Sequence, residues 1–337
     1  MSDLAIGLLS VLLATNTPVA LSNLIARQTG ISIHIPDPND PVEKAYQKLL
    51  AEDDAAQAEV DQWIKAKQER GDANDAELAA LRARIQQRLD QVRQAYEDFL
   101  KQHPNHARAR VAYGSFLNDI QEEDAARVQW EKACELDPKL PAAWNNLGNW
   151  HGHNGSVSNA FRCYLKALEL RPTEPVYYEN LAITMYMFRR DAAAYFNLSE
   201  HDVLQKAMAL YRKALELDPE NFILATEYAQ SYYGFKPPKT GDANTDRKAA
   251  EKHFQDAMAA WTQAAKLARD EIERQGVFLH FARWQIDAGQ FDAARSNLAL
   301  VTHSMYDRTK SNLLRKLDRL QAEARLTNAL APPAPAK

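Results

Sequence analysis

The sequence predicts an all-α fold, and two observations lead to this prediction. Only 11 Gly and 15 Pro occur among the 337 residues, and residues with high helix propensity are abundant. A seven-residue segment at 132–138, KACELDP, also returns as KALELRP at 166–172 and as KALELDP at 213–219. Because recurring segments of this kind mark stacked supersecondary units, the chain is expected to contain tandem helix pairs.

Composition and motifs argue against several classes of function. The 41 Lys and Arg residues against 45 Asp and Glu residues leave a formal net charge of −4, so no nucleic acid partner is expected. Two cysteines, Cys134 and Cys163, cannot form a disulfide framework or a four-thiolate zinc site, and no cofactor is expected. The sequence contains no glycine-rich phosphate loop, Gly-x-Ser-x-Gly or His-Glu-x-x-His motif, so the chain is predicted not to be an enzyme.

Residues 1–40 are interpreted as an appended N-terminal segment with short helices. Residues 4–14 form an apolar run of the length of a signal-peptide core, but Asp3 stands where a basic residue is expected. The run is also shorter than the roughly 20 residues that span a bilayer. A docking helix of a cytoplasmic protein is therefore favoured, and an exported or membrane-associated protein, with membrane contact through residues 1–30, is the alternative.

Residues 41–104 are predicted to form a long antiparallel helical hairpin that merges into the array. Apolar residues recur at spacings of three and four, with a break between Gly71 and Asn74. An intermolecular coiled coil is less favoured, because Asp53 and Lys67 would then lie at core positions of the seam.

Residues 105–304 are predicted to form five helix pairs in tandem. At an offset of 34 residues Gly114 aligns with Gly148 and Trp130 aligns with Tyr164. A small residue on the first helix allows close approach, and the aromatic residue on the second helix fills the space beside it.

Extra residues interrupt the third and fourth pairs. The inserts are placed near 188–203 and 236–246, where the first is expected to prolong the preceding helix toward Ala194. Ser199 and Asp202 resemble a capping arrangement for the next helix, and Thr245 or Asp246 is expected to begin a helix that runs to about Glu273. After the array, residues 305–330 are predicted to form a capping helix that starts near Asn312, and residues 331–337 a disordered tail.

The second pair carries the clearest signature, and it resembles the tetratricopeptide repeat (TPR) family. The resemblance extends over about residues 92–301 and implies a right-handed α-solenoid of about five helix pairs, preceded by the hairpin and closed by the capping helix. The residues that carry it most fully are Trp144, Leu147, Gly148, Ala160, Tyr164, Ala167 and Pro172.

The resemblance further implies that the first helices line a concave groove that binds extended peptides or helices of other proteins. Asn145 and Asn149 lie one helical turn apart, so their amides could donate to and accept from a bound backbone. Local packing or solvation of these side chains is the alternative. The candidate partner-binding residues are Arg108, Asn145, Asn146, Asn149, Glu179, Asn180, Tyr186, Gln230 and Tyr233.

Some members of the family hold a C-terminal carboxylate with Lys, Arg and Asn residues on successive first helices. Val111 and Ser115 stand at the first of these positions here, so that activity is not expected.

Two apparent metal motifs are rejected. His151 and His153 would point about 200° apart on a helix and cannot share an ion. The segment 242–246 begins like a calcium loop, but Arg247 replaces the required Gly and His253 replaces the bidentate Glu.

The sequence therefore predicts a non-catalytic scaffold or adaptor that binds a peptide or helix of a partner protein in the concave groove. The alternative function is an envelope- or membrane-associated assembly component anchored through residues 1–30. The identity of the partner and the oligomeric state are not determined by the sequence.

Overall fold

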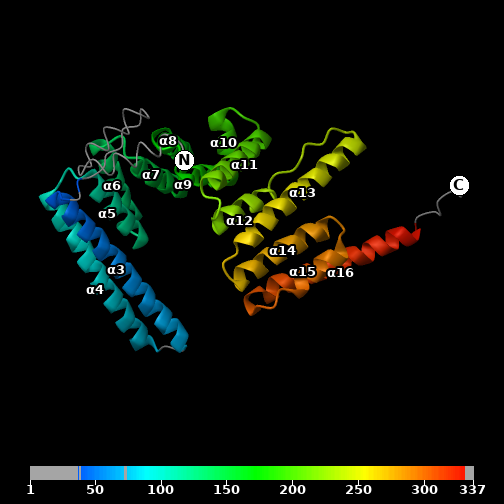
Figure 1. Ribbon diagram of the computed structural model, residues 1–337, viewed down its shortest axis with the longest axis horizontal. Helices are drawn as coiled ribbons and strands as arrows, with labels where there is room; N and C mark the ends of the chain where they lie inside the picture. Colours follow the sequence, from blue (N-terminus) through cyan, green and yellow to red (C-terminus); the bar gives the residue numbers. More distant parts are fainter. Residues whose placement is uncertain (1–36, 38, 72–73, 331–337) are drawn as a thin grey trace, which may run out of the picture. The chain divides into compact units, whose positions relative to one another are not determined.

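The structure is a computed structural model that describes residues 37, 39–71 and 74–330, with residues 327–330 described only as backbone. Within these residues the chain is helical and contains no strand, which confirms the predicted all-α class (Figure 1). The expected N-terminal helices, the anchor or docking element and the C-terminal tail fall on residues outside this part. Among the described residues, no helix has the length and apolar character needed to cross a membrane.

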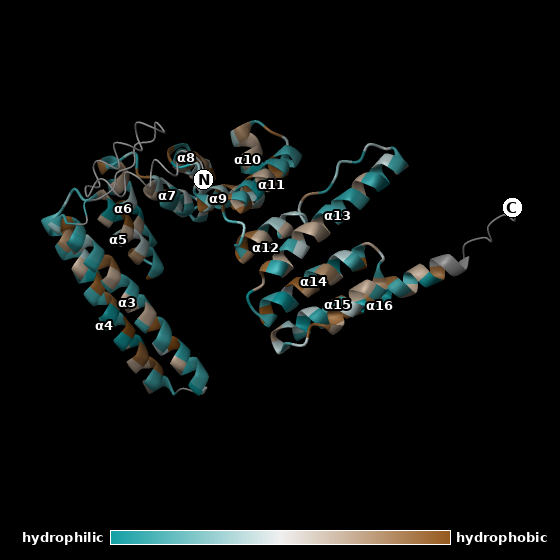
Figure 2. Cartoon of the chain, in the orientation of Figure 1, coloured by the Kyte–Doolittle hydropathy of each residue, from teal (hydrophilic) through white to brown (hydrophobic). Residues whose placement is uncertain are grey.

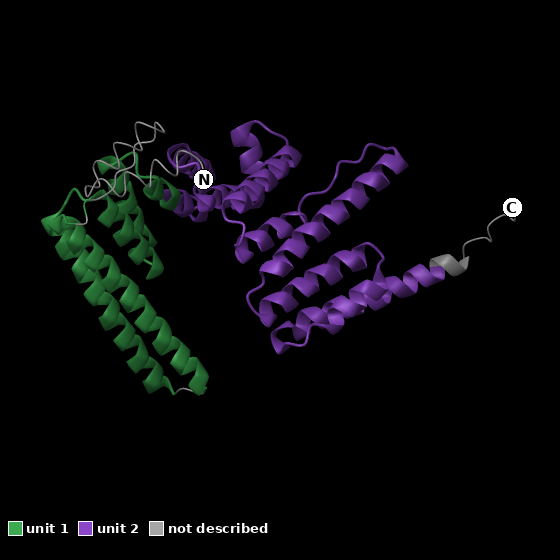
Figure 3. Cartoon of the chain, in the orientation of Figure 1, with its two compact units in different colours: residues 1–146 green, residues 147–337 purple. Residues whose placement is uncertain are grey.

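The chain divides into two compact units, residues 1–146 and 147–337 (Figure 3). The division falls inside helix α7 (Pro141–His153).

Among the described residues, the first helices of the first unit form the predicted hairpin of two long helices, α3 (Pro41–Arg70) and α4 (Asp75–Gln102). Each helix has a side-chain cap, because Asp40 accepts a hydrogen bond from the backbone N–H of Val42 and Asn74 accepts one from Glu77. Hydrophobic and hydrophilic residues alternate along both helices (Figure 2). The two helices bury their apolar stripes against each other within one chain.

Asp53 shows how this hairpin accommodates a polar residue in its seam. The Asp53 side chain is only 7% exposed, and it accepts a hydrogen bond of 2.7 Å from the Tyr96 hydroxyl and one of 2.9 Å from Gln57 Nε2. A buried polar group is tolerated when its hydrogen bonds are made. Asp53, one of the two residues that argue against an intermolecular coiled coil, is thus satisfied inside the hairpin.

Helices α5 (Ala107–Asp119) and α6 (Glu123–Leu136) complete the first unit up to α7. A Cβ atom added at Gly114 would lie 2.4 Å from Nε1 of Trp130. This close approach is the packing of a small residue against a ring that the repeat predicts.

The second unit contains the end of α7 and the remaining helices, which follow one another as further pairs (Figure 1). They are α8 (Val157–Leu170), α9 (Pro175–Met187), α10 (Arg189–Phe196), α11 (Glu200–Leu217), α12 (Phe222–Ser231), α13 (Ala243–Leu267), α14 (Glu271–Asp287), α15 (Phe291–Ala299), the short 3-10 helix η1 (Ser304–Tyr306) and α16 (Asp307–Leu330).

The second helix of each of the first four pairs buries the same three kinds of residue. Two alanines, seven residues apart, are fully buried on each helix, and the ring between them is at most 3% exposed. This spacing places all three on the helix face that meets the first helix. The sets are Ala126, Trp130 and Ala133; Ala160, Tyr164 and Ala167; Ala207, Tyr211 and Ala214; and Ala257, Trp261 and Ala264.

The insert of the third pair differs from the prediction. The first helix does not continue toward Ala194, because α9 ends at Met187 and Phe188 leaves helical geometry at φ −110° and ψ 46°. A separate helix, α10, follows and ends at Phe196, after which Asn197 adopts the left-handed conformation (φ 53°). The predicted cap is present, since Ser199 Oγ accepts a hydrogen bond from the backbone N–H of Asp202 (3.1 Å).

The insert of the fourth pair also differs in its boundaries. Helix α13 begins at Ala243, because Asp242 accepts a hydrogen bond from the backbone N–H of Thr245 (2.7 Å) and so caps the helix. Asp246 does not start the helix. Its Oδ1 accepts hydrogen bonds from the backbone N–H and the hydroxyl of Thr240 instead. The helix ends at Leu267 instead of near Glu273, and a new helix, α14, starts after Asp270.

Helix α16 packs against α14 and α15 and starts five residues before the expected Asn312. Leu317 is fully buried there, and ion pairs join Arg295 to Asp318 (2.7 Å) and Lys316 to Asp287. The helix therefore covers the apolar surface of the last pair, as a terminal cap must.

Candidate partner-binding face

Three of the candidate residues lie in the first unit. Arg108 forms an ion pair with Glu43 of α3 (Nη1 to Oε2, 2.8 Å), and its guanidinium lies 4.8 Å from the centre of the Tyr46 ring. Arg108 thus joins the first helix pair to the hairpin. Because its side chain remains 36% exposed, the residue is not removed from contact with a partner.

Asn145 and Asn146 are held by internal hydrogen bonds. Asn145 is 6% exposed and donates through Nδ2 to Oδ1 of Asn146 (3.4 Å), while Nδ2 of Asn146 donates to the hydroxyl of Ser115 on α5 (3.2 Å). For Asn145 this burial favours the local-packing alternative. Asn146 links two consecutive first helices.

Asn149, in the second unit, is also partly engaged. Its Oδ1 accepts a hydrogen bond of 2.8 Å from the hydroxyl of Tyr164 on α8, and that hydroxyl interacts in turn with the buried Thr184 of α9. The acceptor side of the Asn149 amide therefore serves the packing of α7 on α8.

Glu179 of α9 lies beside Glu227 of α12, which the sequence analysis did not select. The two carboxyl groups share a hydrogen bond, and Oε2 of Glu227 is buried without a hydrogen-bond partner. Burial, together with the adjacent Glu179, raises the pKa of Glu227 to about 7. Burial also raises the pKa of Glu179. Near neutral pH the pair therefore retains a proton that separate carboxylates would lose.

Tyr233 follows the end of α12 and contacts His280 of α14, which was likewise not predicted. The Tyr233 hydroxyl and Nδ1 of His280 are 3.0 Å apart, and the imidazole stacks on the Trp261 ring at 3.9 Å between centroids. Burial, with a contribution from Arg283, lowers the pKa of His280 to about 4, so the ring is neutral at physiological pH. The guanidinium of Arg283 lies 4.4 Å from the centre of the Tyr233 ring.

The other candidates of this unit differ in exposure. Asn180 is half-buried, whereas Gln230 is exposed. Tyr186 is half-buried, and its hydroxyl approaches Gly234 so closely that a Cβ atom there would lie 2.3 Å away. Tyr186 thus has a structural role at the start of the second insert.

The residues of the second unit that lie on or beside successive first helices are called the first-helix face below. They are Glu179, Asn180, Glu227, Gln230, Tyr233, His280 and Arg283. Two contacts across this face, Glu179 with Glu227 and Tyr233 with His280, join α9 to α12 and the end of α12 to α14.

The missed residues had a signal in the sequence. The residue before the Leu-Gly pair of the second repeat is Asn146, and the residues at the same register of the next three repeats are Asn180, Glu227 and His280. Only Asn146 and Asn180 of this register are among the predicted residues. Extending it would have selected both Glu227 and His280.

Comparison with known proteins identifies the class of this chain. A family model described as TmcB, TPR repeats matches residues 42–140, and the model of the tetratricopeptide repeat matches residues 141–174 and 204–221. The interval between the last two matches contains α10. The chain therefore contains tetratricopeptide repeats, and the resemblance to this family is confirmed.

Curated relatives with similar sequences carry the name tetratricopeptide repeat protein 5. The protein from Mus musculus is 26% identical over 203 residues, which cover 59% of this chain and 42% of the relative. The protein from Bos taurus is 24% identical over 199 residues, with the same coverage of 59% and 42%. The chain therefore matches less than half the length of these relatives.

Two solved structures show the same fold. Pseudomonas aeruginosa PilF superposes with a TM-score of 0.50 and 17% identity over 81% of this chain and 99% of PilF. PilW, described as a widely conserved type IV pilus biogenesis factor, superposes with a TM-score of 0.50 and 16% identity over 72% of this chain and all of PilW. The predicted class, an all-α array of tetratricopeptide helix pairs, is confirmed.

Proposed function

We propose that this chain is a non-catalytic scaffold that binds a peptide or helix of a partner protein on the first-helix face. The observation that supports this proposal is the combination of groups on that face. Exposed Gln230 and Arg283 lie on the same face as a half-buried carboxyl pair and the Tyr233 ring. A peptide needs such a mixture, because its amides require donors and acceptors while its side chains require apolar contact.

The carboxyl pair favours a particular kind of partner group on this face. Because the pair is partly desolvated and its carboxyl oxygens accept hydrogen bonds, it favours a cationic or hydrogen-bond-donating group of the partner. Arg283 provides the opposite charge near Tyr233, on α14. The proposed ligand is therefore a segment with a Lys or Arg side chain at one point and an acceptor group further along.

Affinity capture with quantitative mass spectrometry tests this function. Gln230→Ala combined with Arg283→Ala removes two exposed side chains, so the fold is expected to be retained. Recovery of bound partners should fall at least about fivefold, which corresponds to about 1 kcal/mol of binding free energy.

The matched control is Gln263→Ala combined with Lys266→Ala, two exposed positions on the second helix α13. This variant should recover partners as the wild type does. Unchanged recovery of every partner by the Gln230 and Arg283 variant, with an unchanged circular dichroism spectrum, would contradict the proposed face.

A further inference from the structure

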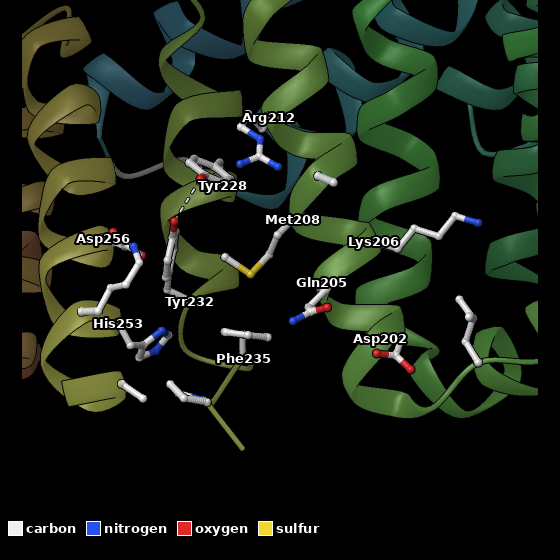
Figure 4. A pocket seen from close by; sticks show the side chains of 15 residues that line it. Asp202, Gln205, Lys206, Met208, Arg212, Tyr228, Tyr232, Phe235, His253 and Asp256 are labelled. Carbon is white, nitrogen blue, oxygen red and sulfur yellow. Dashed lines mark hydrogen bonds and ion pairs between the residues drawn. The ribbon is translucent and has the colours of Figure 1, made fainter. Parts of the chain in front are cut away.

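A cleft lies beside the two inserts of the second unit, and the proposed partner-binding residues do not line it. Its volume is about 810 Å³, and it is lined by α11, by Tyr228 and Tyr232 of α12, by the segment after α12 and by α13 (Figure 4). None of the nine residues proposed from the sequence lines it. The cleft is therefore a separate feature of the second unit.

The lengths of the second helices explain why the cleft exists. Helix α8 begins three residues before its first buried alanine, Ala160, whereas α11 begins seven residues before Ala207 and α13 fourteen before Ala257. The additional residues amount to about one turn in α11 and about three turns in α13. These added turns extend beyond the usual helix pair, and the cleft lies between the added turns of α13 and residues 202–212 of α11.

The inner surface of the cleft is largely apolar. Met208 and Tyr232 face each other across it, and Phe235 lies toward one end (Figure 4). The hydroxyls of Tyr228 and Tyr232 are 2.9 Å apart and bind each other. Because these hydroxyls have a partner, the two rings contribute a stable aromatic wall for a side chain of a ligand.

Among the residues that line the cleft, the cationic side chains outnumber the carboxylates. Asp256 forms an ion pair with Lys252 (2.7 Å), and Asp202 accepts a hydrogen bond from Ser199 Oγ (2.7 Å) at the start of α11. Arg212 and Lys206 are exposed cleft residues for which the described part of the chain provides no ion pair.

The two cations differ in position. Lys206 Nζ lies 4.3 Å from the centre of the Phe196 ring, which does not line the cleft, and in Figure 4 the Lys206 side chain extends away from Met208 and Tyr232. In Figure 4 the guanidinium of Arg212 lies at the end near Tyr228, opposite the end with Phe235. An apolar cleft with the cation of Arg212 at one end is complementary to an anionic ligand that carries an apolar side chain.

We propose that this cleft binds an extended acidic segment of a partner protein, with one apolar side chain against Met208 and Tyr232 and a carboxylate near Arg212. The site lies outside the first-helix face. It gives the chain a second binding surface, so that one scaffold molecule engages two segments.

A defined peptide tests this proposal. The probe is a fluorescein-labelled, end-capped peptide of sequence Ser-Asp-Glu-Phe-Asp-Leu-Glu-Ser, and its binding to the full chain is followed by fluorescence anisotropy. Binding should saturate, and Arg212→Glu should weaken it by about tenfold or more. Lys248→Glu, an exposed charge reversal on α13 outside the cleft, should change it by less than about twofold. Absence of saturable binding, or equal weakening by Lys248→Glu, would overturn the proposal.

The peptide itself supplies two further controls. Replacing Phe and Leu by Ser removes the apolar contact, and replacing Asp and Glu by Lys reverses the charge, so each change should abolish binding. The variant with Gln230→Ala and Arg283→Ala should bind the probe like the wild type. If that variant loses the probe, the peptide occupies the first-helix face, and the cleft proposal fails while the proposed function does not.

Chemical protection locates the bound probe without relying on affinity. Both native cysteines are buried, so Ala209→Cys, at an exposed position in the cleft, introduces a selectively reactive thiol. A saturating amount of the probe should slow alkylation of this thiol by at least about fivefold. It should not slow alkylation of Ala250→Cys, an exposed position on α13 outside the cleft. Equal rates at Ala209→Cys with and without the probe would contradict occupation of the cleft.

Discussion

The regular helix pairs at residues 107–170 and the insert-bearing pairs at 175–267 use the same buried residues in the same register. Their second helices nevertheless differ in length. Helices α6 and α8 each have 14 residues, whereas α11 has 18 and α13 has 25. The alanines and the ring define only the part of a second helix that meets its first helix. Additional turns before that part leave the core unchanged and provide new surface.

The two regions also start their second helices differently. Helices α6 and α8 have no side-chain hydrogen bond at the N-cap, but Ser199 caps α11 and Asp242 caps α13. In a regular pair a short turn leads from one packed helix into the next, so tertiary packing holds the helix start. An extended helix begins away from its partner, and its free backbone N–H groups need a local acceptor.

The largest expected effect tests whether both regions depend on the same ring. Trp130→Ala in a regular pair and Trp261→Ala in an insert-bearing pair should each lower the free energy of unfolding by about 3–5 kcal/mol, because both rings are buried. Urea denaturation followed by far-UV circular dichroism measures the change. A large loss for Trp130→Ala with less than about 1 kcal/mol for Trp261→Ala would show that the insert-bearing pair is held by other contacts.

The next effect concerns the small residue opposite the ring. A Cβ atom at Gly148 would lie 2.5 Å from the Tyr164 ring, so Gly148→Ala forces that ring to move. The cost of overpacking exceeds the gain in helix propensity, and we expect a net destabilisation of about 1–2 kcal/mol.

The insert-bearing region provides the converse substitution. Ala182 occupies the register of Gly148 and packs in one core cluster with Tyr211. Ala182→Gly should lose about 1 kcal/mol, because glycine costs backbone entropy and leaves a small void. Thermal unfolding of both variants provides the comparison. Stabilisation by Gly148→Ala would indicate that the regular pair does not require the close approach.

A third experiment tests the raised pKa of Glu227, whose carboxyl group stands at the register of Asn146 and Asn180 in the earlier repeats. The pKa of Glu227 is raised from the ordinary value of 4.5 to about 7 in the folded chain. Between these values the folded state binds more protons than the unfolded state, so stability falls as pH rises from about 4.5 to 7. Above that window Glu227→Gln should be more stable than the wild type by about 1 kcal/mol, with allowance for solvent screening of a partly exposed group.

Thermal unfolding across this pH range checks the expectation. The advantage of Glu227→Gln should be present at about pH 8 and vanish near pH 4.5. Glu220→Gln, at an exposed position, is the matched control and should show no such dependence. An advantage of Glu227→Gln that does not change with pH would contradict the shared proton.

The smallest effect concerns the caps. Ser199→Ala should destabilise the chain by about 0.5–1 kcal/mol, because the backbone N–H of Asp202 loses its acceptor. Ser156→Ala, at the equivalent start of α8, should change stability by less than about 0.5 kcal/mol, because Ser156 makes no capping hydrogen bond. Urea denaturation measures the stability of both variants. Equal losses of stability for Ser199→Ala and Ser156→Ala would contradict the proposed difference between the two kinds of helix start.

The sequence was informative wherever an interaction is local or recurs with the repeat. The buried alanines and rings were found from their spacing, and the Ser199 cap from a pattern over four residues. The end of α9 at Met187 was missed, because no Gly or Pro marks it and the break depends on backbone geometry at Phe188. The start of α13 was misplaced because Thr240 engages the Asp246 carboxylate, a contact across a loop that local propensity does not reveal.

The sequence by itself determined the family, the all-α class and the residues that pack each helix pair, since these follow from periodicity and from the sizes of side chains. Only the tertiary structure decided which polar residues remain accessible. It buried Asn145, joined Glu179 to Glu227 across 48 positions of the chain and opened the cleft between α11 and α13. These features depend on which side chains meet after distant helices pack, and burial then sets their charge and their access to solvent.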